Sequence, residues 1–340
     1  MPGTAPPTPA VVEVVTQVVY HLSLSVPLGI GLAVGALAVP DGPVSRQVRR
    51  LAVPAAIVVV IGIALQLQAA AHVTGPALVQ LLALALAACG LVAMRWTNSR
   101  ALARGVAAIA IVAAVVPETP LQWTNVSRVA SNALTAVHVL GAITWVGGLA
   151  VLPITAITLR RSTTQVSDES GLAADWAQIW ERFSLVALVA VGALVVSGTW
   201  LAWSHVGTPA QLVTTPYGRA LAIKLALVVV LVCAGAYNAR VLLPRMRVLQ
   251  HDGDSRGVFR LAAQHFPTVV LGEALVAVGV LTVVPFLHGS ARTQAGGPSA
   301  APFDLSTFAT GLVLVAVVAA AMRAGTRRSI RPGAPSTPAP

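Results

Sequence analysis

The sequence predicts an all-α, polytopic bundle of transmembrane helices with about nine spans. Of the 340 residues, 56% are hydrophobic and only 10% are charged, whereas a soluble domain carries about 25% charged residues. Apolar runs of about 20 residues recur along the whole chain, which is the length that a membrane-spanning helix needs. Each run is too long and too apolar for a strand of a transmembrane barrel.

The first run is expected to remain as a helix, because the residues before it contain no Lys or Arg and therefore lack the basic region of a secretory signal. The fifth and seventh runs are long enough to tilt or protrude. The expected spans lie at 11–39, 51–71, 76–95, 101–117, 129–159, 182–204, 219–243, 264–286 and 303–323.

One further segment is predicted to be helical without crossing the membrane. Its large apolar side chains share one face at helical spacing, which favours a short interfacial helix that leads into the sixth span. These side chains are Leu172, Trp176, Ile179, Trp180 and Phe183.

The basic residues alternate between the gaps that separate the spans. One set of gaps, together with the C-terminal tail, holds 18 arginines, and the other set holds only Arg128, Arg219 and Arg292. By the positive-inside rule, the N-terminus is outside and the C-terminus is inside. The net charge of +11 is thus explained by cytoplasmic loops that face anionic lipid, and no nucleic-acid partner is expected.

The apolar runs separate near residues 118–128 into a four-span part and a five-span part, and the five-span part has three sections. Residues 1–128 form an N-terminal region of four spans, 129–290 a second membrane domain, 291–323 a final span, and 324–340 a Pro-rich tail expected to be disordered. The chain has no Walker A loop, no phosphorylation segment of a P-type ATPase, no H-E-x-x-H and no G-x-S-x-G. No catalytic residue and no enzymatic activity are therefore expected.

Five of the seven histidines fall on the outer side or in the outer half of the membrane. Histidines at a headgroup level are often only interfacial, whereas a polar side chain within a span indicates function by default. Those within spans are His21 and His138, and an interhelical hydrogen bond is the structural alternative for His138. Those near outer helix ends are His72, His205 and His288.

Two other ionisable residues lie within spans. Lys224, the only lysine of the chain, is about one and a half turns into the seventh span, and Glu273 is near the middle of the eighth. A charge at these depths needs a partner or a water-filled cavity. A Lys224–Glu273 pair is the obvious candidate, with either a structural role or a role in a transport pathway.

The face of the helix around His138 has an unusual composition. Gly141, Trp145 and Gly148 follow His138 at spacings of 3, 4 and 3, and Gly147 lies beside them. Such glycines allow a helix or a flat ligand to approach the backbone. The face is therefore suited to a metal pathway, to a haem pocket or simply to helix packing.

For copper, the composition of the outer side favours a histidine site that binds copper(II), or copper in transit, over a copper(I) cage. Imidazole suits copper, zinc, iron and nickel, whereas copper(I) cages use thiolates and thioethers. Only two cysteines and four methionines are present, and Cys89 and Cys233 lie away from the histidines. A bis-histidine haem b, on His138 with His21 or His205, is the alternative.

Several motifs resemble the copper resistance protein D (CopD) family over residues 129–290. They are "HVLGAITWVGG" in the fifth span, "RFS" and "SG" in the sixth, "TTPYGRALAIK" and "NAR" in the seventh, and the helix with Glu273. This resemblance implies a bacterial inner-membrane protein that imports copper or confers copper tolerance, with a CopC-like copper-binding partner outside. The helix histidine and helix lysine are also similar to those of HemJ-type haem-pathway proteins, which leaves a haem-linked oxidoreductase open. A non-catalytic assembly subunit is the third possibility.

Overall fold

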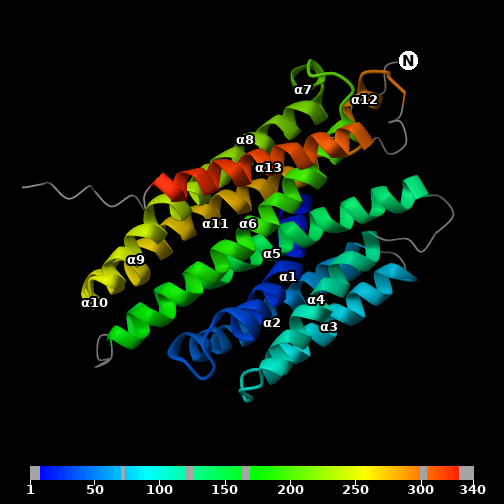
Figure 1. Ribbon diagram of the computed structural model, residues 1–340. Helices are drawn as coiled ribbons and strands as arrows, with labels where there is room; N and C mark the ends of the chain where they lie inside the picture. Colours follow the sequence, from blue (N-terminus) through cyan, green and yellow to red (C-terminus); the bar gives the residue numbers. More distant parts are fainter. Residues whose placement is uncertain (1–7, 70–72, 119–125, 163–168, 299–304, 329–340) are drawn as a thin grey trace, which may run out of the picture.

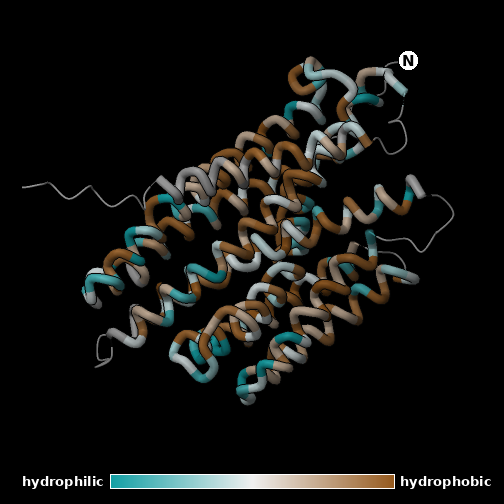
Figure 2. Tube along the Cα trace, in the orientation of Figure 1, coloured by the Kyte–Doolittle hydropathy of each residue, from teal (hydrophilic) through white to brown (hydrophobic). Residues whose placement is uncertain are grey.

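The structure is a computed structural model, and it describes residues 8–69, 73–118, 126–162, 169–298 and 305–328. These residues form helices and no strand (Figure 1), so the predicted all-α bundle is confirmed. Eight of the helical segments are long and apolar enough to cross a membrane. Figure 2 shows that apolar residues cover most of their length and that many of the hydrophilic segments lie toward the helix ends.

The N-terminal half of the chain contains five long helices. They are α1 (Val11–Leu32), continued by a π-helical turn η1 (Ala33–Leu37), then α2 (Pro43–Ala69), α3 (Pro76–Ala93), α4 (Arg100–Val115) with a 3₁₀ turn η2 (Val116–Glu118), and α5 (Val126–Ser162). Local signals explain two of the starts. Pro76 occupies the first turn of α3, where no backbone donor is lost. The side chain of Ser99 caps α4 by accepting a hydrogen bond from the Leu102 amide.

The C-terminal half combines long helices with short ones. They are α6 (Glu169–His205), α7 (Gln211–Thr214), α8 (Pro216–Tyr237), η3 (Asn238–Leu242), α9 (Leu243–His251), α10 (Ser255–Phe259), η4 (Arg260–His265), α11 (Phe266–Val283), η5 (Val284–Phe286), α12 (Ala291–Gln294) and α13 (Leu305–Arg328). Helix α8 begins with Pro216, and Thr215 caps it through the Gly218 amide.

The ninth predicted span, 303–323, corresponds to α13, which packs against α6. The eight candidate spans found among the described residues do not include it, so a ninth crossing and the orientation of the termini stay predictions. Helix α13 continues to Arg328. The segment expected to be disordered from residue 324 thus begins as helix, and residues 329–340 lie outside the described part of the chain.

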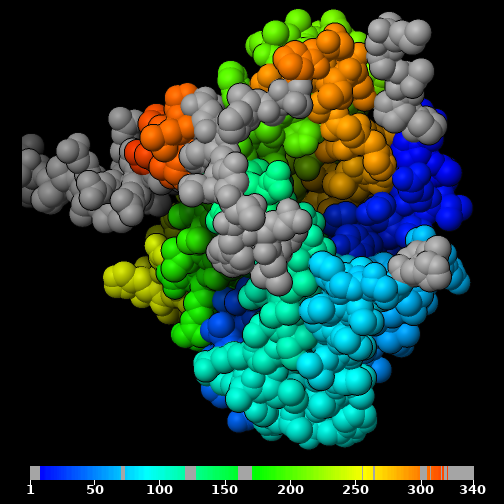
Figure 3. Space-filling view, turned by 90° about the vertical axis from the view of Figure 1, so that its right-hand side faces the viewer, coloured from blue at the N-terminus to red at the C-terminus, as the bar shows by residue number. Residues whose placement is uncertain are grey.

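Helix α1 lies at the centre of the bundle and packs against α2, α4, α5 and α11. Helices α3 and α4 pair on one side, and α6, α8, α11 and α13 lie on the other side of α5 (Figure 1). In Figure 3 the cyan helices α3 and α4 fill the lower part of the molecule, and the green and orange C-terminal elements fill the upper part. The histidine-bearing helices α1 and α5 therefore lie side by side at the junction of the two halves.

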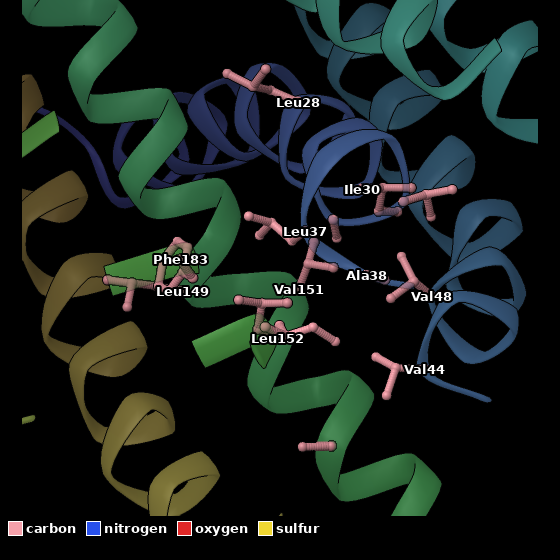
Figure 4. Close-up of a cluster of buried hydrophobic side chains, with 14 of the residues drawn as sticks. Leu28, Ile30, Leu37, Ala38, Val44, Val48, Leu149, Val151, Leu152 and Phe183 are labelled. Carbon is pink, nitrogen blue, oxygen red and sulfur yellow. The ribbon is translucent and has the colours of Figure 1, made fainter. Parts of the chain in front are cut away.

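Two glycines set the distance between α1 and α5. A Cβ atom added at Gly147 would overlap the carbonyl oxygen of Ser25 and lie 3.0 Å from the backbone nitrogen of Gly29. A residue with a side chain thus cannot occupy this crossing without moving a helix backbone. Figure 4 shows the core next to the contact, where leucines of α1 and η1 face leucine and valine side chains of α5.

Three arginines cap the end of helix α1. The guanidinium of Arg100 donates to the carbonyl oxygen of Ala38 at 2.6 Å, that of Arg104 to Gly35 at 3.1 Å, and that of Arg182 to Leu37 at 2.9 Å. The last carbonyl groups of a helix have no partners within the helix and carry its partial negative charge. The arginines satisfy these groups and connect α4 and α6 to α1.

We expect Arg100→Gln to lower the free energy of unfolding by about 1–3 kcal/mol, because it leaves a partly buried carbonyl group without its charged donor. Arg95→Gln is the matched control, since Arg95 is exposed in the same interhelical turn and its replacement removes the same charge. The thermal unfolding midpoint of the detergent-purified protein measures the effect. Equal midpoints for the two variants would show that the cap contributes nothing.

The interfacial helix predicted before the sixth span is wrong. Helix α6 is continuous from Glu169, and its N-terminal half is buried inside the protein rather than lying on the membrane surface. Trp180 stacks on Phe266 with ring centroids 4.5 Å apart and donates to the carbonyl oxygen of Ala262 at 2.9 Å. The shared apolar face was correctly identified, but α6 packs there against α10, η4 and Phe266, the first residue of α11.

Candidate functional site

His138 lies on α5 and is held by α6. Its Nδ1 atom lies 3.1 Å from the hydroxyl oxygen of Ser197, which itself lies 2.6 Å from the carbonyl oxygen of Ala193. The hydroxyl has a single hydrogen and donates it to that carbonyl, so it accepts from the Nδ1–H group of His138. This assignment leaves the lone pair of a neutral imidazole on Nε2.

The next residue along α6 makes room for the ring. A Cβ atom added at Gly198 would lie 3.3 Å from the Cε1 atom of His138. Ser197 and Gly198 therefore position the imidazole of His138. Ser197 does so by a hydrogen bond, and Gly198 leaves space for the ring because it has no side chain. The sequence analysis did not identify Ser197 as a site residue. The Ser197-Gly198 pair within an apolar span is the feature of the sequence that could have indicated it.

His21, on α1, has the same hydrogen-bond pattern. Its Nδ1 atom lies 2.6 Å from the carbonyl oxygen of Gln17, so Nδ1 carries the hydrogen and Nε2 has the lone pair. Lys224, on α8, is close enough to act electrostatically on the imidazoles of both His21 and His138. Three helices thus each carry one nitrogen-bearing side chain, with Lys224 in electrostatic range of both imidazoles, and we call these three residues the His–Lys cluster.

The pairing expected for Lys224 is wrong. Glu273 accepts a hydrogen bond from the side chain of Asn238, and the two ion pairs found among the described residues are Arg247–Glu181 and His288–Glu13. Lys224 and Asn238 are 14 residues apart, which corresponds to about 21 Å along a helix. The lysine and the glutamate therefore lie at different depths of the bundle.

The remaining histidines do not join this cluster. The ring of His205 stacks on Tyr217 at a centroid distance of 5.7 Å, and its Nδ1 lies 2.8 Å from the carbonyl oxygen of Leu201. His288 is exposed, with Nε2 3.8 Å from a carboxylate oxygen of Glu13. His72 lies outside the described residues. Within the described part of the chain, no three His, Cys, Asp or Glu side chains are grouped so that they could hold a metal ion.

The glycines near His138 serve helix packing. A Cβ atom at Gly141 would lie 3.0 Å from the carbonyl oxygen of Ala190, and one at Gly148 would overlap the ring of Phe183. Trp145 is 7% exposed and belongs to the main hydrophobic core. The face that suited either a ligand or a neighbouring helix is therefore covered mainly by α6, while Gly147 meets α1.

The geometry connects the motifs of the sequence in pairs. Phe183 of "RFS" covers Gly148 of "WVGG", and Ser197 of "SG" holds the fifth-span histidine. The asparagine of "NAR", Asn238, donates a hydrogen bond to Glu273 of α11. The spacing of these motifs along the chain thus corresponds to contacts between neighbouring helices.

The family model of copper resistance protein D (CopD) matches residues 177–287. This range covers most of α6 and all of α8 and α11, and it is narrower than the domain expected at 129–290, since it omits α5. Comparison with the curated proteins gives no match, and neither does comparison with the solved structures. The helical bundle and the CopD match together indicate a copper-resistance-related, multi-pass membrane protein. Residues 177–287 of the chain are therefore identified as similar to the CopD family.

Proposed function

We propose that this chain imports copper across the bacterial plasma membrane and thereby contributes to copper homeostasis. The observation that carries the proposal is the His–Lys cluster. His21 and His138 each use Nδ1–H in a hydrogen bond, so each presents a free Nε2 lone pair. A partner on the second ring nitrogen is the usual arrangement for a histidine that binds a metal ion.

Lys224 favours transit over storage. A positive ammonium group within electrostatic range of both imidazoles repels a bound cation. Conduction requires sites that bind an ion well enough to admit it and weakly enough to release it. The copper ion is the cargo in this proposal, and because no ATPase motif was found, its movement is passive or coupled to a gradient.

The outer end of the bundle suits delivery by a copper-binding protein of the CopC type. His288 is exposed there beside α12, and His205 lies near the adjoining α7. Both short helices lie at the same end of the molecule in Figure 1. We propose that these two histidines receive the ion before it reaches the His–Lys cluster.

Copper accumulation tests the proposal directly. A strain in which the gene is deleted should contain less copper than the parent, and a plasmid copy of the gene should restore the copper content, as measured by mass spectrometry of washed cells. Equal copper contents in the parent, deletion and complemented strains would refute import. A strain that lacks only the CopC-like partner should show an intermediate content.

A bis-histidine haem is the second candidate, because it would use the same Nε2 atoms of His21 and His138. The visible spectrum and the copper and iron contents of the detergent-purified protein separate the two candidates. A Soret band with bound iron would establish haem and remove the role of these histidines in copper import. A colourless preparation that binds added copper would support the copper pathway.

A further inference from the structure

A second polar site lies deep in the inner half of the bundle. Glu273 of α11 and Asn238, the first residue of η3, are each 6% exposed, and the Asn238 Nδ2 atom lies 2.5 Å from Oε1 of Glu273. Glu273 interrupts an otherwise apolar helix, and Asn238 lies at the end of the apolar part of α8, two residues before Arg240. A carboxyl group placed there is costly unless it is paired with a cation or carries a proton.

The described residues provide no cation for Glu273. Helix α11 packs against α1, α5, α8 and η4. The basic residues of these elements and of η3 are His21, Arg128, His138, Arg160, Arg161, Arg219, Lys224, Arg240, Arg260 and His265. Among the residues whose side chains the structure describes, no charged group acts electrostatically on Glu273, and the polar partner of its carboxyl group is the uncharged Asn238.

The amide of Asn238 can serve either protonation state of the carboxyl group. In the structure its NH₂ group faces the carboxylate, and its buried Oδ1 atom has no hydrogen-bond partner. When the amide turns over, Oδ1 can accept a hydrogen bond from a protonated Glu273. A separation of 2.5 Å is short for an N–H···O bond and lies at the short end of the range for O–H···O bonds, so the protonated form can occupy the same distance.

The location of this pair connects it to the His–Lys cluster. Helix α8 carries Lys224 and continues into η3, which begins with Asn238, so one continuous helical segment bears both sites. Helix α11 also contacts α1 and α5, which carry His21 and His138. Asn238 lies in a π-helical turn, and such turns are frequent at functional sites.

We propose that Glu273 and Asn238 form a proton-binding site that couples copper movement to the proton gradient. A hydronium ion gives its proton to a carboxylate oxygen of Glu273 and becomes water, and the proton later returns to a water molecule, so one O–H bond breaks as another forms in each direction. The amide of Asn238 turns over with each protonation change. The coupling rests on the proposed copper import, whereas proton binding at Glu273 does not.

Infrared difference spectroscopy of the purified protein tests the proton site without any transport. A pH step should change a carbonyl band of a protonated carboxylic acid, and Glu273→Gln should remove that band. Asn238→Leu should shift the band, because it removes the hydrogen-bond partner and keeps the acid. Glu181→Gln, at an exposed carboxylate that pairs with Arg247, should leave the band unchanged. A band that persists unaltered in both Glu273→Gln and Asn238→Leu would overturn the proposal.

Proteoliposomes test the coupling. Copper entry into wild-type vesicles should change several-fold with an imposed pH gradient, and Glu273→Gln should abolish this response while copper binding to the purified protein stays intact. Entry that is indifferent to the gradient would refute the coupling. An absence of copper entry in the wild type would refute import itself, and the infrared band would still decide whether Glu273 binds a proton.

Discussion

Replacing His138 with alanine should abolish the copper accumulation that the complementing gene produces. Loss of an outer-shell partner of a metal ligand typically reduces affinity by about 10–100-fold, so loss of the ligand itself should have at least that effect. His138 supplies one of the two Nε2 lone pairs of the His–Lys cluster, and the described residues contain no third histidine beside it. The measurement is the copper content of the deletion strain that carries the variant, at matched membrane expression.

The control for this variant is His251→Ala. His251 is exposed at the end of α9, far along the chain from the His–Lys cluster, so its replacement should leave copper accumulation unchanged. If His138→Ala accumulates as much copper as the wild type, the histidine serves only to hold α5 against α6.

Ser197→Ala should give a smaller defect than His138→Ala. The hydroxyl fixes which ring nitrogen carries the hydrogen, and its removal frees the imidazole to rotate or to change tautomer. We expect copper affinity of the purified protein to fall by about tenfold while the fold is retained. An unchanged affinity would show that the hydrogen bond does not orient the ligand.

Gly147→Ala should destabilise the protein strongly, although it adds only one methyl group. The new carbon would overlap the carbonyl oxygen of Ser25 and crowd the backbone of Gly29, and a helix backbone cannot move aside as a flexible side chain can. Overpacking of a well-packed core costs about 1–3 kcal/mol, occasionally more. We expect a lower unfolding midpoint in detergent and less protein in the membrane.

Gly235→Ala provides the matched comparison on α8. A Cβ atom at Gly235 meets no atom within 4 Å, and alanine favours a helix by about 1 kcal/mol relative to glycine. This variant should therefore be as stable as the wild type or slightly more stable. Equal stability of the two glycine variants would contradict the close contact between α1 and α5.

The sequence predicted the helices well and their ends less well. Apolar runs mark where a helix must lie in lipid, but they do not mark where it ends outside the membrane. Helix α2 begins at Pro43, eight residues before the expected 51, and its first two turns bury Val44 and Val48. Helix α6 likewise begins at Glu169 rather than at 182. Both extensions pack against other parts of the protein, and a pattern of hydropathy along one segment contains no information about such partners.

The candidate site was predicted residue by residue but not as an arrangement. His21, His138 and Lys224 were each identified by the cost of a polar group in a span, and this cost is local. Which of them meet depends on how α1, α5 and α8 are arranged around each other. The same argument predicts an ion pair between Lys224 and Glu273, an acidic residue within a span. The structure instead pairs Glu273 with Asn238. Asparagine carries no charge, so the argument from cost did not single it out.

The close contact between Gly29 and Gly147 also marks the point about which α1 and α5 would tilt relative to each other. Gly29 is eight residues from His21 and Gly147 is nine residues from His138, so both histidines lie about 12–14 Å along their helices from the crossing point. At that radius, a change of about 10° in the angle between the helices would alter the separation of the imidazoles by about 2 Å. Such a tilt would move the two imidazoles toward or away from each other without any change of side-chain rotamer.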